Sequence, residues 1–125
     1  MTQQLSIFDV IVPPAIRRPV EPYGNVVQEE SHETLRLPHP RIAWGKARIE
    51  LHQHSDGLWM WATNFNLSGW GGGYRVGPKW GKFADTRDAA LHHAVQEIKG
   101  RVAKRARETT DKERREVTVW AEGLL

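Results

Sequence analysis

Aromatic rings and basic side chains are concentrated in the middle of the chain, a combination typical of nucleic-acid binding. Bases stack on exposed rings while cations contact phosphates, and each stacked base contributes roughly 1–3 kcal/mol. Six tryptophans occur in 125 residues, and five of them lie between Trp44 and Trp80. We expect a surface that binds nucleic acid, or another protein, to comprise Arg48, His52, His54, Trp59, Trp61, Phe65, Trp70, Lys79, Trp80 and Lys82.

The same rings have an alternative, structural interpretation. If the C-terminal helix or the N-terminal segment covers them, they form part of a core and bind nothing.

A second basic segment, from Lys99 to Arg115, holds eight Lys and Arg residues interrupted by three acidic ones. Phosphate contact there would be salt-sensitive, but a solvated helix face with i, i+4 ion pairs is the more common meaning of such a run.

The histidines raise the question of a metal site. His52 and His54 are two residues apart, so on a strand their imidazoles project from one face, an arrangement that zinc or copper can use in a small metal-dependent enzyme. His92 and His93 are adjacent and cannot share one face of a helix, and no acidic residue accompanies them at metal-site spacing. We therefore expect solvated surface histidines, and neither a metal nor a cofactor.

No set of catalytic residues can be grouped from the sequence. A nucleophile, a general base and an orienting acid are not recognisable as a set, and Gly71-Gly72-Gly73 lacks the lysine and hydroxyl residue that follow a phosphate-binding loop. The expectation is a binding protein rather than an enzyme.

A β-hairpin must position the aromatic residues. Residues 47–52 alternate apolar and polar side chains, and residues 58–65 are the most apolar run in the chain. Asp56-Gly57 lies between them and favours a two-residue type I′ turn, which needs two positive φ values.

This turn fixes a register in which Ser55 opposes Leu58 and His54 opposes Trp59. The core face then carries Ile49, Leu51, Leu58, Met60 and Ala62, while the opposite face carries the aromatic, histidine and arginine side chains. A loop one residue longer would shift the register and change this assignment.

The elements after the hairpin are a loop, a strand and two helices. Residues 66–73, with four glycines in five positions, predict a mobile loop, and Tyr74–Val76 predicts a third strand. Asp85 or Thr86 should cap a helix, and Thr110 to Glu113 has the form of a capping box for a second helix. The apolar stripes are Leu91, Ala94, Val95, Ile98 and Val102 in the first helix, and Val117, Trp120 and Leu124 in the second.

Together these elements predict a small α+β domain. Three antiparallel strands would carry the amphipathic helix on one face, with a second short helix following. We expect the domain to span residues 41–125, after a Pro-rich linker at 13–40 in which Val26 and Val27, or Leu35 and Leu37, can add a short strand.

Composition limits the function classes. Charged residues make up 26% of the chain and the net charge is +3, which alone does not indicate nucleic-acid binding. The absence of cysteine excludes a disulfide framework and thiolate zinc sites. No apolar run is long enough to cross a membrane, and the N-terminus lacks a signal-peptide pattern, so we expect a soluble, cytoplasmic protein.

The N-terminal segment carries the one recognisable motif. Gln4-Leu5-Ser6-Ile7-Phe8 resembles the peptide by which many bacterial proteins bind the β sliding clamp of DNA replication, with Ile7 where leucine is more common. The resemblance covers five residues and implies a partner, not a fold. It implies that Gln4 enters a polar pocket while Leu5, Ile7 and Phe8 fill an apolar cleft. The alternative is an edge strand at residues 5–12 that packs on the domain.

These features favour a non-enzymatic adaptor of DNA metabolism. The residue 1–12 peptide would dock on the clamp, and the domain would bind single-stranded or structured nucleic acid, as suits a phage or mobile-element accessory factor. The alternative is an inhibitor of a host defence or restriction protein that uses the Trp-rich face, since Trp and Arg are frequent interface hot spots.

Overall fold

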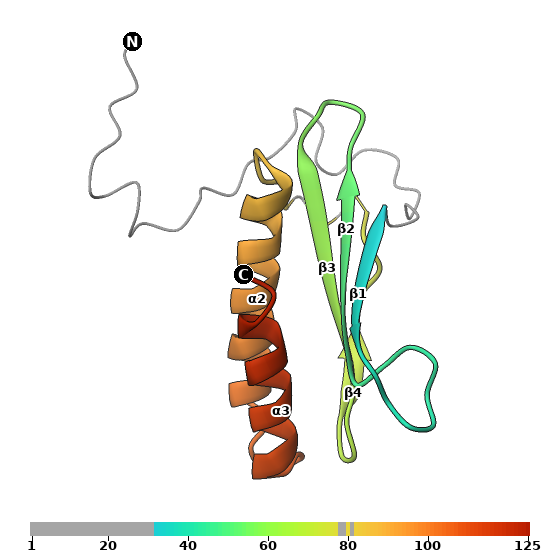
Figure 1. Cartoon of the computed structure of the whole chain (residues 1–125), viewed down its shortest axis with the longest axis vertical. Coiled ribbons are helices and arrows are strands. Elements are labelled where there is room, and N and C mark those ends of the chain that lie inside the picture. Colours follow the sequence, from blue (N-terminus) through green and yellow to red (C-terminus); the bar gives the residue numbers. More distant parts are fainter. Residues whose placement is uncertain (1–31, 78–79, 81) are drawn as a thin grey trace, which may run out of the picture.

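A four-stranded antiparallel sheet with two helices on one face forms the domain in this computed structural model, which describes residues 32–77, 80 and 82–125 (Figure 1). The α+β class and the antiparallel sheet confirm the sequence prediction, but the sheet has four strands rather than three. In spatial order the strands are β1 (Glu33–Leu37), β2 (Ala47–Gln53), β3 (Trp59–Asn66) and β4 (Gly71–Gly73), and the helices are α2 (Arg87–Ala103) and α3 (Asp111–Glu122).

Strand β1 comes from the segment that the sequence assigned to the linker. Leu35 and Leu37 pair with Ile49 and Ala47 on β2, as one of the two added-strand alternatives predicted. The described sheet therefore begins before residue 41. The peptide at residues 1–12 and the linker up to residue 31, including Val26 and Val27, lie outside the described residues.

The β2–β3 hairpin forms, but its turn differs from the predicted one. Gly57 N donates to His54 O (2.9 Å) and His54 N donates to Leu58 O (2.7 Å), so the loop has three residues. Gly57 has a φ of 90°, whereas no described non-glycine residue has a positive φ. A type I turn followed by a left-handed glycine fits these values, and the predicted type I′ turn is wrong.

The longer loop shifts the register by one residue. Leu51 pairs with Trp61 and Ala47 pairs with Phe65, so these rings lie on the helix side of the sheet. Met60 and Ala62 point to the opposite side, which we call the open face, together with Arg48 and the other even-numbered residues of β2. The prediction that the aromatic rings share a face with Arg48, His52 and His54 is therefore wrong.

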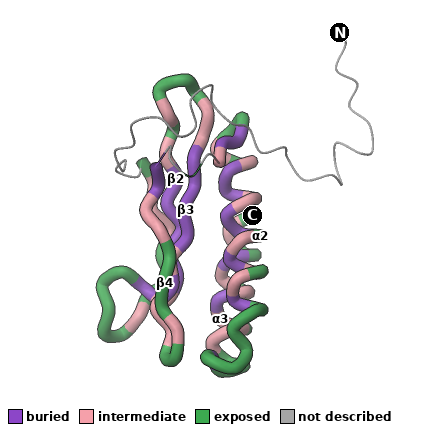
Figure 2. The backbone as a smooth tube through the Cα atoms, turned by 180° about the vertical axis from the view of Figure 1, so that it is seen from behind, coloured by how far each residue is buried: buried purple, intermediate pink, exposed green. Residues whose placement is uncertain are grey.

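Helix α2 covers the helix side of the sheet as its apolar stripe predicted. Thr86 is the N-cap and its hydroxyl accepts from Ala89 N (3.0 Å), while Asp88 in the first turn favours the helix dipole. Figure 2 shows buried backbone along β2, β3 and the inner side of α2. The buried core here is Ala47, Ile49, Leu51, Trp61, Phe65, Ala84, Ala90, Leu91, Ala94, Val95, Ile98, Val102, Val117 and Ala121.

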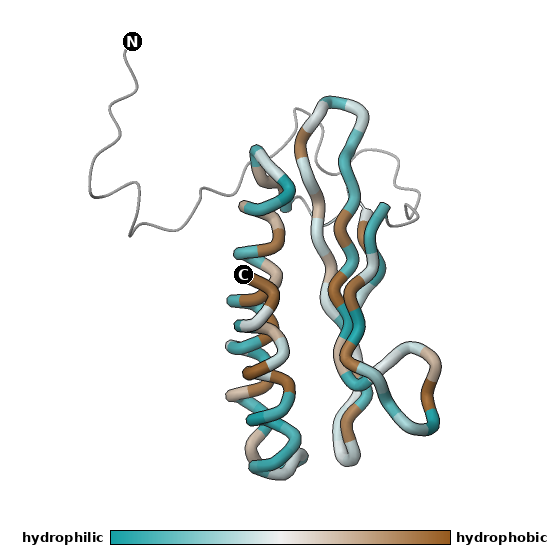
Figure 3. The backbone as a smooth tube through the Cα atoms, viewed as in Figure 1, coloured by the Kyte–Doolittle hydropathy of each residue, from teal (hydrophilic) through white to brown (hydrophobic). Residues whose placement is uncertain are grey.

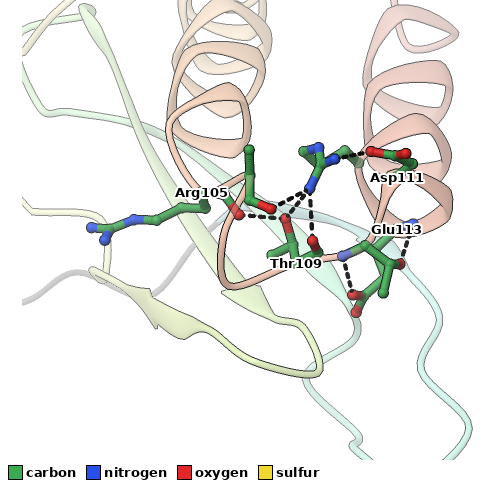
Figure 4. Close-up of polar contacts among 7 residues, drawn as sticks. Arg105, Thr109, Asp111 and Glu113 are labelled. Carbon is green, nitrogen blue, oxygen red and sulfur yellow. Dashed lines mark hydrogen bonds and ion pairs between the residues drawn. The ribbon is translucent and has the colours of Figure 1, made fainter.

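Helix α3 folds back beside α2, and the sequence left this choice open (Figures 1 and 3). Its capping box is present, because Glu113 N donates to Thr110 Oγ1 (3.1 Å) and Thr110 N donates to Glu113 Oε1 (2.9 Å). Thr109 Oγ1 also donates to Arg105 O (2.6 Å), which closes the connection between the helices (Figure 4).

The predicted mobile loop is a tight hairpin that docks on this connection. Leu67 N donates to Trp70 O (2.9 Å), and Ser68 donates through N and Oγ to the Glu113 carboxylate (2.8 and 2.7 Å). Burial alone would raise the pKa of Glu113, but hydrogen bonds from Ser68 and Thr110 outweigh it and lower the pKa to about 2. Gly69 permits the close backbone approach here, because a Cβ at this position would overlap Glu108 O.

Beyond Gly73 the chain leaves the sheet instead of forming the predicted third strand. Tyr74 N still donates to Thr63 O (3.1 Å), after which the chain crosses to the open face. There Val76 and Phe83 pack on Met60 and Ala62 in a second small core. Ala84 then pairs with Trp59 and returns the chain to the sheet before α2.

We predict that Gly69→Ala lowers the free energy of unfolding by about 1–3 kcal/mol, because the added Cβ would overlap the carbonyl of Glu108. Gly72→Ala is the matched control, since no described atom lies within 4 Å of a Cβ at Gly72. It should leave stability unchanged or slightly raised. Urea unfolding of both variants measures the difference, and equal loss of stability would contradict the docked hairpin.

Candidate functional site

The rings predicted to form an exposed stacking platform are mostly buried. Trp61 is 3% exposed and Phe65 is fully buried, and the His93 ring stacks on Trp61 at 5.1 Å between centroids. Trp59 is partly buried against the same core, and Trp70 packs on Phe65 at 4.7 Å. These residues therefore fit the alternative interpretation, in which the rings are part of a core. The residue that stacks on Trp61 is His93 of α2, not a residue of α3.

The predicted histidines lie on the open face. His52 stacks on His32 with 3.9 Å between ring centroids, and His54 meets Phe83 edge-on at 5.6 Å. His92 and His93 are on α2, on the other side of the sheet. Within residues 32–77, 80 and 82–125, no group of three or more potential metal ligands comes together.

The open face has a hollow of about 320 Å³ lined by Trp44, Arg48, Asn64, Asn66 and Arg75, which we call the arginine hollow. Arg48 is on β2 and Asn64 is its register partner on β3. Asn66 Nδ2 donates to Gly45 O (3.1 Å), and this bond ties the loop that carries Trp44 to the end of β3. Three separate parts of the chain therefore meet at one concave surface.

Positive charge exceeds negative charge in the arginine hollow. The Arg48 and Arg75 Nε atoms lie 3.8 and 3.2 Å from Glu50 Oε2, and Glu50 also accepts from Val76 N (2.9 Å). Burial lowers the pKa of the Arg48 guanidinium, Glu50 opposes this shift, and nearby Arg75 and Arg36 add to it. The Glu50 carboxylate thus faces two guanidinium groups, and the charge of a third, Arg36, acts on Arg48.

Arg48 is the most constrained of these cations. Its side chain is only 4% exposed, and its Nε and Nη1 atoms have no hydrogen-bond partner among the described residues. A buried donor without a partner costs about 1–3 kcal/mol, more when it is charged. Both atoms are buried, so an anion in the hollow would be attracted by the charge of Arg48 rather than bonded to these two donors.

Trp44 forms the outer wall of the hollow. It is 49% exposed, and the Arg48 guanidinium lies 4.2 Å from its ring centroid. Arg75 approaches the same ring at 5.9 Å. The ring is thus held by cation–π contacts and still has surface that a planar ligand can cover.

Sequence reasoning missed four residues of this hollow: Trp44, Asn64, Asn66 and Arg75. Trp44 was one of the clustered tryptophans. A large aromatic residue in a polar loop is the sequence feature that could have identified it as a site residue. Arg75 gave no signal, because its place depends on the chain crossing to the open face after β4. Of the predicted surface residues that the structure describes, only Arg48 lines this hollow.

A second hollow, of about 360 Å³, lies at the helix side of the sheet edge and surrounds Glu97 of α2; we call it the glutamate hollow. Glu97 accepts hydrogen bonds from Thr63 Oγ1 (2.5 Å), Tyr74 Oη (2.6 Å) and Lys82 Nζ (2.7 Å). The lining residues are Gly73, Tyr74, Trp80, Lys82, Glu97 and Arg101, so two predicted site residues, Trp80 and Lys82, meet here.

The hydrogen bonds decide the protonation states in the glutamate hollow. Burial would raise the pKa of Glu97, but the bonds from Lys82, Thr63 and Tyr74 outweigh it and hold the pKa below its ordinary value. Burial, and then the charge of Glu97, raise the pKa of Tyr74. Tyr74 is therefore a neutral hydrogen-bond donor and is poorly suited to act as a base.

The basic run at residues 99–115 does not form one continuous surface. Arg101 and Arg105 lie over the Trp70 ring at 5.6 and 5.0 Å. Arg114 donates to the carbonyl of Thr109 (2.7 Å) and so caps the interhelical connection. Lys99 and Arg115 line a third hollow, of about 440 Å³, between α2 and α3.

The remaining predicted site residues are Lys79 and the clamp-motif residues Gln4, Leu5, Ile7 and Phe8, and they lie outside the described residues. None of the described helices has both the length and the apolar character needed to cross a membrane. Comparison with protein-family models, with curated proteins and with solved structures finds no match to this chain.

We predict that Glu97→Gln lowers the free energy of unfolding at neutral pH by roughly 1.5–3 kcal/mol, because it weakens charge-assisted hydrogen bonds. The pKa of Glu97 is lowered in the folded state, so its stabilising effect is present above the ordinary value of 4.5 and is lost as pH falls below it. The difference between wild type and variant should shrink in that range.

Urea unfolding at a series of pH values measures this difference. Glu122→Gln is the control, because that carboxylate is 53% exposed and its ion pair among the described residues is with Lys99, at 3.4 Å. If the difference in the free energy of unfolding between wild type and Glu97→Gln stays constant down to low pH, the charge of Glu97 has no stabilising role.

Proposed function

We propose that this chain is a non-enzymatic accessory protein of DNA metabolism. Its N-terminal motif would dock on the bacterial sliding clamp through Gln4, Leu5, Ile7 and Phe8, and its domain would bind nucleic acid at the arginine hollow. The observation that carries the second part is the buried Arg48 guanidinium beside a half-exposed tryptophan, because its Nε and Nη1 atoms have no hydrogen-bond partner among the described residues.

A phosphate is the anion that best matches this hollow. A guanidinium offers a planar set of donors that pairs with phosphate oxygens, and Arg48 and Arg75 lie on either side of a single shared carboxylate. The amides of Asn64 and Asn66 add polar lining without further charge. Most protein–DNA hydrogen bonds go to phosphate and sugar, for which these groups are suited.

Trp44 adds a reason to favour a nucleotide over a simple anion. Its exposed ring stands at the mouth of a site lined by cations, so a base can stack on the ring while its phosphate meets the arginines. A protein partner would also use Trp and Arg, and inhibition of a host defence protein remains the second candidate. Salt separates the two, because phosphate contacts weaken steeply as salt rises.

We predict that Trp44→Ala weakens binding of labelled oligo-dT by roughly 5- to 100-fold, the loss expected for one stacked base. Arg75→Ala should also weaken binding. It should reduce the slope of log affinity against log salt by about 1, which corresponds to the loss of one phosphate contact. Lys112→Ala, at an exposed position of α3, removes the same charge and should change little.

Fluorescence anisotropy at several salt concentrations measures these effects. Absence of oligonucleotide binding by the wild-type chain, or the same affinity for the Trp44→Ala and Lys112→Ala variants, would contradict a nucleic-acid site in the arginine hollow.

We also predict that Phe8→Ala lowers affinity for purified β sliding clamp by roughly 30-fold or more, as loss of an interface hot spot does. Gln4→Ala should weaken it too, whereas Thr2→Ala, outside the motif, should not. Surface plasmon resonance on immobilised clamp measures both. Undiminished binding after removal of residues 1–10, or no binding by the intact chain, would overturn the clamp proposal.

A further inference from the structure

We infer that one single strand of nucleic acid occupies both hollows by crossing the glycine strand β4. This inference rests on the proposed nucleic-acid function and adds a second subsite, the glutamate hollow, and a preference for unpaired strands.

The two hollows lie on opposite sides of one sheet edge. Asn64 lines the arginine hollow, and its register partner Gly73 lines the glutamate hollow. The next two residues separate in the same way: Tyr74 Oη donates to Glu97 on the helix side, whereas Arg75 Nε lies 3.2 Å from Glu50 on the open face. Among the described residues, the β3–β4 edge and the chain that leaves it at Tyr74 and Arg75 lie between the two sites.

The strand at this edge has no side chains to obstruct a ligand. Gly71–Gly73 are all exposed, and no described atom lies within 4 Å of a Cβ built at Gly72. Leu67 N donates to Trp70 O, and Tyr74 N donates to Thr63 O, across the β3–β4 pair. Hydrogen-bonded positions alternate along an antiparallel ladder, so Gly71 and Gly73 direct their N–H and C=O groups away from β3. Outward N–H groups are suitable donors to phosphate oxygens.

Each hollow combines cations with a partly exposed tryptophan. In the glutamate hollow Trp80 is 38% exposed and meets the Tyr74 ring edge-on at 5.0 Å. Lys82 and Arg101 supply two positive charges against the one negative charge of Glu97. Trp80 Nε1 donates to Arg75 O (2.9 Å). Arg75, which lines the arginine hollow, therefore helps to position the Trp80 ring of the glutamate hollow.

This arrangement suits a single strand better than a duplex. Bases in a duplex are stacked inside the helix, so rings at the rim of two shallow hollows have no free base face to contact. A single strand can bend over the edge and place one base on Trp44 and another on Trp80, with phosphates at the cations and at the glycine backbone.

The test uses substitutions at Gly72, where space is available. Gly72→Asp puts a carboxylate on the crossing point and should weaken binding of an oligo-dT of about 16 nucleotides by roughly fivefold or more, whereas Gly72→Asn, of nearly the same size, should not. Gly72→Lys should strengthen binding. Trp80→Ala should weaken it by an amount similar to Trp44→Ala, and blunt duplex of the same length should bind more weakly than the single strand.

The outcomes separate this inference from the proposed function. If Trp44→Ala weakens binding while Gly72→Asp and Trp80→Ala leave it unchanged, the arginine hollow binds nucleic acid alone and the crossing path is overturned. If the duplex binds as tightly as oligo-dT, the single-strand preference is overturned. If the wild-type chain binds neither, the nucleic-acid function and this inference both fail. Urea unfolding of each variant confirms that the domain is folded before binding is compared.

Discussion

The side of the sheet on which each side chain lies depends on the register of the β2–β3 hairpin, which the left-handed Gly57 in a three-residue loop fixes. Side chains alternate along a strand, so a shift of one residue would exchange the two faces of β3. In the observed register Trp61 lies opposite Leu51 under α2, and Ala62 lies opposite Glu50 on the open face. Burial of large rings against the helix stabilises the domain, while the open face carries Arg48 and Glu50 on β2.

Two carboxylates then hold the irregular segment after β4 against both sides of the sheet. Glu50 accepts from Val76 N and meets Arg75 on the open face, and Glu97 accepts from Tyr74 and Lys82 on the helix side. Each carboxylate is buried enough that desolvation would be costly without these donors. Residues 74–77 of this segment belong to no strand, so side-chain hydrogen bonds help to fix their conformation. The same segment supplies Arg75 and Trp80 to the hollows.

The parts of the fold that could be predicted from the sequence are those set by local spacing. The stripe ending at Val102 and the capping box at Thr110 depend on residues within one or two helical turns, and both predictions are confirmed. The hairpin register was wrong because one extra loop residue changes every pairing while leaving the apolar pattern almost the same. The glycines from Gly69 suggested mobility because the reason for Gly69, its close approach to Glu108, lies in a distant part of the chain. The candidate site was predicted least well, since Trp44 and Arg75 meet only through tertiary contacts.

The position of Arg48 also explains why the site and the core are kept apart. A buried guanidinium with unpaired donors destabilises a domain, and an apolar residue on β2 would remove that cost. The domain tolerates it because the apolar area needed for stability is supplied on the other face, where Ile49, Leu51 and Trp61 pack beneath α2. Under the proposed function, a cation that is incompletely neutralised within the domain is what an anion-binding surface requires, since a fully neutralised one would attract an anion less. On that proposal, the cost in stability on the open face is the physical counterpart of anion binding.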